Sequence, residues 1–377
     1  MHRPKFTVSQ SDIQQQAVAS LKSWLASSTR TLPTWLAPLL VWMAARKTSL
    51  AMAAQRLTQV PGVERVRQVM HFFLPVPDQL LAGFQRSLAT MAPRRLRKRK
   101  WCLAIDLHDR PYYGQPQESL RRAQAKKGTK RFFSYATCCL VGTTQRWTIA
   151  VVAVSADMSL EEVIDQLLDQ IRAQGWKIRC LLLDRGFYSA AVIDRLLRRR
   201  VPFLMPMIRR GKRGRHSADD TGTQRFFRRG CQGHFTYSWV ARGKPSLGGP
   251  QVTVQVACAP PSDRRRSPWV YVYWGLKWSL SYLNQTYRQR FGIESSYRQL
   301  GQALANTTSR NATYRLLLVL ISLLLRNLWV WSQQMARGRL ELAWLLDLLA
   351  HTTVDILGLS NPAYFPTPSQ LPPARKR

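Results

Sequence analysis

Three acidic residues stand out in a chain that is otherwise strongly basic. The protein has 377 residues, with 57 Lys and Arg against 20 Asp and Glu and a formal net charge of +37. Asp106 ends the strand-like run 101–106, Asp184 ends a second run at 178–184, and Glu294 lies in a stretch with helical spacing. Phosphodiester chemistry that uses two metal ions needs carboxylates that converge on a cationic surface. These residues therefore indicate an enzyme that cuts and joins DNA.

The ends of strands would hold the two aspartates in fixed places. If the first and fourth predicted strands are neighbours, Asp106 and Asp184 lie side by side at one edge of the sheet. Adjacent carboxylates repel each other unless divalent cations neutralise them, and hard oxygen ligands favour Mg²⁺ or Mn²⁺. Taken singly, each aspartate is more simply explained as a turn residue or a helix cap. Asp109 and His108 lie close to Asp106 in the sequence and compete with it as ligands.

A second group of polar residues has helical spacing. Tyr287, Arg290 and Glu294 stand at i, i+3 and i+7, so one face of a helix would present all three. A surface pair between Arg290 and Glu294 is the simpler alternative, and such pairs contribute little to stability. That alternative leaves the dense polar run 287–298 unexplained.

The positive charge is distributed along the whole chain. Basic clusters occur at 94–100, 121–131, 195–200, 209–215 and 264–266. Repulsion on this scale destabilises a fold unless a polyanion neutralises it, so the expected partner is nucleic acid. A ribosomal-type protein or a binder of anionic membranes is the alternative. The spread of charge along a large chain with 13 Trp favours nucleic acid.

Cysteine usage and hydropathy predict an intracellular protein. The six cysteines form no C-x-x-C pair, and we expect reduced, buried thiols rather than a zinc site. The segment 1–6 has no apolar signal sequence. The longest apolar run, 316–325, is shorter than the ~20 residues of a membrane span, so we interpret it as a buried helix.

The sequence pattern predicts helices in the N-terminal quarter of the chain. Apolar residues recur every three to four positions between about 12 and 90. The segment 48–57, the break at 60–63 and a second helix at 64–73 have helix-turn-helix spacing, although an ordinary helical hairpin has the same pattern. The basic linker 93–100 ends this module.

Strand-like runs begin after the linker. They occur at 101–106, 132–141, 146–154, 178–184 and 203–207, and capping residues Ser159 and Ser189 open helices that end near 173 and 200. This order predicts an α/β fold with a mixed five-stranded sheet and helices packed on its faces. Residues 208–276 are rich in glycine and short alternating runs, which predicts a β-rich insertion. The Pro-rich, basic segment 356–377 is expected to be disordered.

The residues and motifs described above resemble the DDE transposases of prokaryotic insertion sequences. The chain is similar to the group with an RNase H-like core and a Y-x2-R-x3-E-x6-K signature, whose first three positions are matched by Tyr287, Arg290 and Glu294. The segments 106–114 and 184–188 also resemble that group's motifs around its first two aspartates. The resemblance covers about residues 45–335, and the interval before Glu294 has room for the family's β-rich insertion.

The resemblance implies a division of the chain into regions. A helical DNA-binding domain would occupy 1–93, the first part of the RNase H-like core 94–207, the insertion 208–276, the C-terminal helices of the core 277–355, and the tail 356–377.

The resemblance also implies a function and a set of site residues. The enzyme would bind the ends of an insertion sequence, cleave the DNA and join the 3′ ends to target DNA, as a homodimer on paired ends in the nucleoid of a prokaryotic cytoplasm. Asp106, Asp184 and Glu294 would be catalytic and would hold two Mg²⁺ ions, which Mn²⁺ can replace. Phosphate contacts would come from Tyr287, Arg290, Arg298 and Arg185. Three tryptophans of the insertion, Trp239, Trp269 and Trp274, would stack a flipped base or else belong to the core of the β-rich region.

One position departs from the family pattern. The signature lysine falls at position 301, which is Gly301, and Arg298, one turn earlier, is the candidate to replace its phosphate contact. This departure leaves two alternative functions open, an inactive or domesticated transposase that only binds DNA and a stand-alone RNase H-like nuclease. The helical N-terminal module and the insertion argue against the small nuclease, and the three acidic residues argue against the inactive protein.

Overall fold

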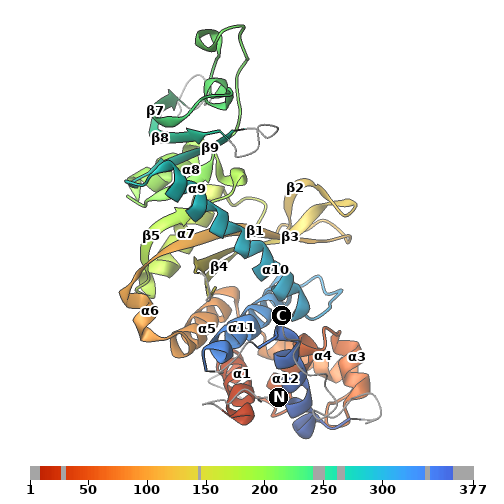
Figure 1. Ribbon diagram of the computed structural model, residues 1–377. Coiled ribbons are helices and arrows are strands. Elements are labelled where there is room, and N and C mark those ends of the chain that lie inside the picture. Colours follow the sequence, from red (N-terminus) through yellow and green to blue (C-terminus); the bar gives the residue numbers. More distant parts are fainter. Residues whose placement is uncertain are drawn as a thin grey trace. The chain divides into compact units, whose positions relative to one another are not determined.

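The computed structural model describes residues 9–26, 31–142, 146–240, 251–260, 268–335 and 340–359, without the side chains of residues 217 and 294–296. The chain divides into two compact units (Figure 1). One unit comprises Arg94–Ile293 and is built on a β-sheet. The other combines Met1–Pro93 with Glu294–Arg377 and is helical where it is described. The predicted disordered tail 356–377 begins too early, because residues 356 and 357 end the helix Leu342–Leu357 and Leu357 is buried. From residue 360 onward the tail lies outside the described residues.

One mixed sheet runs through the first unit. Its strands are β1 (Lys100–Pro111), β2 (Arg121–Lys126), β3 (Thr129–Val141), β4 (Thr148–Val154), β5 (Lys177–Leu182), β6 (Phe203–Pro206), β7 (Gly233–Val240), β8 (Gln251–Ala259) and β9 (Trp269–Trp274). Their order in the sheet is β2-β3-β1-β5-β6-β9-β8-β7, and β4 pairs with β3.

The five predicted strands form the centre of this sheet. The strand β3 is antiparallel to both β1 and β4, whereas β5 is parallel to both β1 and β6. The predicted fold class, a mixed five-stranded α/β core, is confirmed. The prediction that the first strand ends at Asp106 is wrong, because the next five residues continue the ladder with β3 as far as the pair Pro111–Phe132. The sequence pattern also missed β2.

The β-rich insertion extends the core sheet. Its last strand, β9, is antiparallel to β6, and β8 and β7 continue outward from β9. The inner strand β9 has four buried residues out of six, whereas the edge strand β7 is largely exposed. All six cysteines are free thiols, and the sulfur atoms of Cys231 and Cys258 lie 3.0 Å apart in this region.

Two predicted helices pack beside the core strands. The helix α7 (Leu160–Ala173) begins with a capping box formed by Ser159 and Glu162, and it packs against β4 through its apolar face. The helix α8 (Ala190–Arg198) is capped by the Ser189 hydroxyl, which accepts a hydrogen bond from the amide of Val192. The unit also contains α6 (Arg94–Lys98) and α9 (Leu280–Arg288). The helix α10 (Gly292–Gln302) begins in this unit and ends in the other one.

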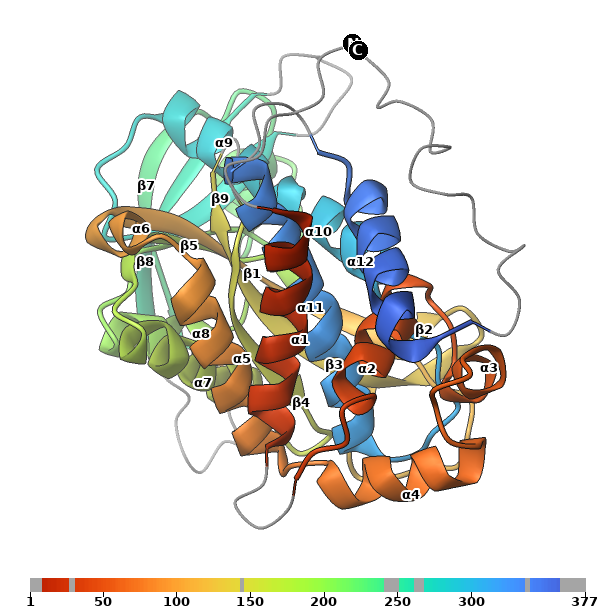
Figure 2. The ribbon, with the colours of Figure 1, turned by 90° about the horizontal axis from the view of Figure 1, so that it is seen from below.

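The helical unit joins segments that are far apart in the sequence. It contains α1 (Gln10–Leu25), α2 (Leu36–Ala45), α3 (Leu50–Arg56), α4 (Val63–Phe73), α5 (Pro77–Met91), α11 (Ala312–Met335) and α12 (Leu342–Leu357). The early helices α2 and α5 pack against the late helices α12 and α11, respectively (Figure 2). The helices α3 and α4 occupy the segment with helix-turn-helix spacing, and DNA reading by this pair stays a prediction.

The helix α11 is longer than the apolar run in the sequence suggests. Its 24 residues are long and apolar enough to cross a membrane, and 83% of its most apolar window is buried inside the protein. It also carries buried polar groups: the Ser322 hydroxyl donates to the carbonyl of Leu300 at 2.7 Å, and Arg326 donates to Gln299. These contacts agree with the prediction of a buried helix.

Candidate active site

The parallel pairing of β1 and β5 brings the first two candidate carboxylates together. Ala104 lies opposite Leu182, and Asp106 and Asp184 each follow two residues later along these adjacent chains. Asp184 comes just after β5 ends and caps the short 3₁₀ helix Arg185–Phe187, where its side chain accepts a hydrogen bond from Gly186 N at 2.9 Å. The predicted adjacency of the two strands is therefore confirmed.

Asp106 has an unusual electrostatic environment for a carboxylate. Its side chain is 15% exposed, and burial raises its pKa to about 6, with a further contribution from the negative charge of Asp184. The positive charge of Arg290 and a hydrogen bond from Leu107 N at 2.9 Å oppose this rise. Asp106, whose carboxylate is costly to ionise in this environment, and the neighbouring Asp184 present only hard oxygen donors, which fits a divalent cation.

Arg290 is the cation that the protein itself places beside this carboxylate. Its Nη1 donates to Asp106 Oδ2 at 3.4 Å, and its Nε donates to the Tyr287 hydroxyl at 3.2 Å. Tyr287 in turn donates its hydroxyl proton to the carbonyl of Leu183 at 3.2 Å. Both side chains are buried, with 7% and 5% of each residue exposed, so Tyr287 fixes the guanidinium beside the aspartates.

The stretch that holds Tyr287, Arg290 and Glu294 is not one continuous α-helix, and a face shared by all three side chains stays a prediction. Tyr287 belongs to α9, Arg290 to a 3₁₀ turn at Gln289–Phe291, and Glu294 is the third residue of α10. The tighter 3₁₀ turn changes the angle between successive side chains, so the 3.6-residue period does not hold across this stretch. Tyr287 and Arg290 still meet, because side chains three residues apart lie on the same side of both an α-helix and a 3₁₀-helix.

Glu294 is described only by its backbone. Among the side chains that the structure describes, no three His, Cys, Asp or Glu residues gather in a group that could hold a metal ion, and Glu294 is not one of those side chains. The start of its helix is held by Arg146, whose Nη1 donates to the carbonyl of Gly292 at 3.1 Å. A Cβ atom at position 292 would overlap the Arg146 guanidinium, so a larger residue there would displace the end of this flexible side chain. Sequence reasoning missed Arg146, because no spacing links it to a helix that begins 146 residues later.

Asp109 and His108 have different roles from that of Asp106. Asp109 is an odd number of residues from Asp106 along β1, so the two side chains point to opposite faces of the sheet. The Asp109 side chain is 5% exposed and accepts hydrogen bonds from Ser134 at 2.7 Å, Lys126 at 3.0 Å and Arg121 at 3.2 Å. It therefore holds β1, β2 and β3 together. Burial lowers the pKa of His108 to about 4, which leaves its imidazole neutral.

The remaining predicted contacts lie on several elements. Arg185 and Arg298 are exposed, and position 301 has open space around it because a Cβ there would meet nothing within 4 Å. Trp239 is stacked with Tyr188 and Tyr237, at centroid distances of 6.0 and 5.2 Å. Trp269 and Trp274 are half-buried at the two ends of β9. The tryptophans therefore lie on the strands of the insertion, and base stacking by them stays a prediction.

Comparison with known proteins identifies the class of enzyme. Residues 97–328 match the family described as "Transposase DDE domain", so the chain belongs to the DDE transposases. Among curated proteins, none matches the sequence. A solved structure, the cryo-EM synaptic complex of piggyBac transposase with hairpin DNA, is similar with a TM-score of 0.57 and 12% identity, and the match covers 94% of this chain and 82% of that one. At this identity the likeness concerns the fold. The predicted enzyme class, a DDE transposase, is confirmed.

Proposed function

We propose that this transposase binds the two ends of an insertion sequence, hydrolyses the phosphodiester bond at each end and joins the freed 3′ ends to target DNA. The observation that carries the proposal is the parallel register of β1 and β5, which places Asp106 and Asp184 side by side with Arg290 against Asp106. The similar piggyBac transposase structure is a complex with hairpin DNA, and the net charge of +37 on this chain suits a polyanion. A homodimer on paired ends is part of this proposal.

The residues that would hold two Mg²⁺ ions are Asp106, Asp184 and Glu294, since DDE transposases use divalent metal ions. Such ions activate the attacking oxygen and stabilise charge on the leaving oxygen. Arg290 would contact a non-bridging oxygen of the cleaved phosphate, because its guanidinium already lies beside Asp106 and a planar fork suits phosphate. Tyr287 would act through Arg290, because its hydroxyl bonds to that side chain and to the carbonyl of Leu183.

The test is cleavage and strand transfer with purified protein, a duplex carrying the inverted repeats that flank the gene, and a target plasmid in Mg²⁺. A transposase cuts at the repeat and links the 3′ end to the plasmid. A stand-alone nuclease would cut without joining, and an inactive relative would bind without cutting. Either of these two outcomes would overturn the proposal.

We expect DNA binding to be tight and strongly dependent on salt. A protein that neutralises Z phosphates of duplex DNA shows log K falling against log[salt] with a slope of roughly −0.9Z, and Z should be on the order of ten here. The reason is the recurrence of basic clusters in the linker, the core and the insertion. Fluorescence anisotropy between low and moderate salt measures the slope. A slope equivalent to one or two contacts would mean that the charge does not serve a duplex.

We expect Arg298→Ala to reduce cleavage strongly and Gly301→Lys to restore part of the loss in the double variant. Arg298 is four residues after Glu294 on α10, and the open space at position 301 accepts a lysine side chain. Single-turnover cleavage of a transposon-end duplex measures both effects. If Arg298→Ala cleaved within about twofold of the wild-type rate, Arg298 would only form an exposed ion pair, which contributes at most about 1 kcal/mol. That result would exclude the idea that Arg298 replaces the phosphate contact of the signature lysine.

A further inference from the structure

The hairpin of β2 and β3 projects from the active-site strand β1 and carries an excess of cations. We define the basic arm as residues 113–131, which contain Arg121, Arg122, Lys126, Lys127, Lys130 and Arg131 against the single acid Glu118. Its strands are joined by a type I′ turn: Lys127 and Gly128 have φ angles of 51° and 79°, and Lys126 pairs with Thr129. The arm is therefore a structured hairpin.

Asp109 fixes the base of the arm to β1. It bonds to Arg121 and Lys126 of β2 and to Ser134 of β3, so it balances two of the arm's cations. It lies three residues beyond Asp106, which is about 10 Å along an extended strand. Asp109 thus holds the arm in a fixed position relative to the proposed cleavage site, on the same unit of the protein.

Two other arginines of the arm face each other across the strands. Arg122 lies directly opposite Arg131 in the antiparallel register, and like charges at such positions destabilise a strand pair. Within the described residues, neither of them has an acidic side chain as partner; Arg131 donates from Nη1 to the carbonyl of Gly114 at 3.0 Å. An anion bound between the two guanidinium groups would remove this repulsion.

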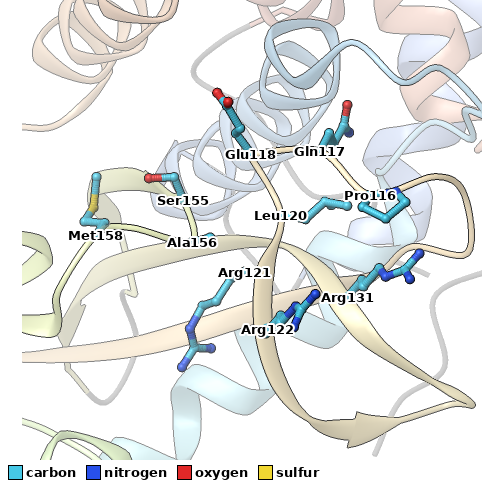
Figure 3. Close-up of a pocket in the computed structure, with 10 residues that line it drawn as sticks. All are labelled: Pro116, Gln117, Glu118, Leu120, Arg121, Arg122, Arg131, Ser155, Ala156 and Met158. Atoms are coloured by element: carbon cyan, nitrogen blue, oxygen red, sulfur yellow. The ribbon is translucent and has the colours of Figure 1, made fainter.

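A pocket lies beside this pair. It has a volume of about 510 Å³, and Arg121, Arg122 and Arg131 line one side of it, with Glu118, Ser155 and Met158 on the other (Figure 3). The carboxylate of Glu118 points away from the arginines in this view (Figure 3). Guanidinium groups bind phosphate oxygens through two parallel hydrogen bonds, so the pocket suits a phosphate group.

We infer that the basic arm binds a backbone phosphate of the transposon-end DNA, with Arg122 and Arg131 as its ligands. The inference rests on the proposed cleavage function. Arg131 lies beside Tyr112, which is six residues and so about 20 Å along the strand from Asp106, and the phosphate that the arm binds therefore lies about that far from the cleaved bond. The arm then sets the register of the duplex relative to Asp106 and Asp184 and adds no reacting group.

The experiment compares Arg122→Ala and Arg131→Ala with the control Lys130→Ala. Lys130 is adjacent to Arg131 on β3, is exposed and points to the opposite face of the strand, so its removal deletes the same charge without touching the pocket. We expect each arginine variant to weaken duplex binding about 10-fold or more, because it removes a pair of hydrogen bonds between charged groups. We expect Lys130→Ala to have a much smaller effect. Circular dichroism and thermal melting establish that each variant is folded, and Arg122→Gln and Arg131→Gln replace any variant that is not.

A second readout identifies the phosphate. We would measure binding to a series of duplexes, each with one neutral methylphosphonate near the cleaved bond. At one position the methylphosphonate should weaken binding by the wild-type protein but leave binding by the double variant Arg122→Ala/Arg131→Ala unchanged. If the arginine variants match Lys130→Ala, or if no methylphosphonate position is coupled to them, the arm binds no specific phosphate. Wild-type cleavage in the same assay separates this failure from a failure of the proposed function, in which the wild type would not cut.

Discussion

Replacing Asp106 with Asn should lower the rate of transposon-end cleavage by about 10³-fold or more and leave the affinity for DNA nearly unchanged. Loss of a metal-binding carboxylate removes several kcal/mol of transition-state stabilisation. The affinity depends on contacts between Lys or Arg and phosphates elsewhere on the protein. Single-turnover cleavage and fluorescence anisotropy on the same duplex measure the two quantities. We expect Glu294→Gln to behave in the same way.

Asp169→Asn is the matched control for these variants, because Asp169 is an exposed acid on α7 of the same unit and belongs to neither the proposed active site nor the pocket beside the basic arm. It should cleave at the wild-type rate. If Glu294→Gln nicked transposon ends as fast as wild type, Glu294 would not belong to the site, and the third ligand would have to be sought among other residues. If Asp106→Asn kept full activity, Asp106 would not be a metal ligand, and the proposed active site at the ends of β1 and β5 would be wrong.

Two aspartates three residues apart on β1 should have opposite effects on stability. In metal-free protein, Asp106→Asn should raise the free energy of unfolding by about 1 kcal/mol, because the ionised carboxylate is buried beside Asp184. Asp109→Asn should lower it by about 2 kcal/mol, because it breaks a buried network with Ser134, Arg121 and Lys126. Urea denaturation in EDTA at pH 7.5 measures both changes.

The pH dependence of these two effects has opposite sign. Asp106 has a folded-state pKa of about 6, above its ordinary value of 3.8, so its ionised form opposes folding above pH 6 and the penalty disappears as the pH falls toward 4. Burial alone would raise the pKa of Asp109, but its hydrogen bonds from Ser134 and Lys126 and the nearby cations bring it below 3.8. Its stabilisation is therefore present above pH 4 and is lost at lower pH. Equal shifts for the two variants across this range would contradict the assigned environments.

The sequence predicted the strands that hold the aspartates, because strand runs and capping residues are local signals. The alternation at 101–106 and 178–184 and the capping box at Ser159 are visible within ten residues. The order of the elements allowed β1 and β5 to be neighbours but did not require it, because the helix α7 connects β4 rather than β1 to β5. Short-range patterns therefore predicted the two strands, and their pairing stayed a condition until the register of β1 and β5 was known.

What the sequence did not predict depends on contacts between distant or strongly charged segments. The strand β2 has the pattern Arg-Arg-Ala-Gln-Ala-Lys, which lacks β-branched and aromatic residues and so gives no strand signal. From the sequence alone, Asp109 is a possible metal ligand. In the structure it is surrounded by Arg121, Lys126 and Ser134, which occupy its carboxylate. The packing of α11 and α12 against the N-terminal helices has no local signal at all, because an apolar helix face does not specify its partner.

The joining of early and late helices in one unit has a consequence for how the protein is made. Nine of the ten residues of α2 are buried, and α12, which packs on it, begins about 300 residues later in the sequence. At 5–20 residues per second a ribosome needs roughly 15–60 s to make that interval, and during this time α2 lacks its partner. The sheet unit at 94–293 has all of its strands before α12 is synthesised. We therefore expect the strands of the sheet unit to pair before the helical unit, which needs both ends of the chain, can complete its packing.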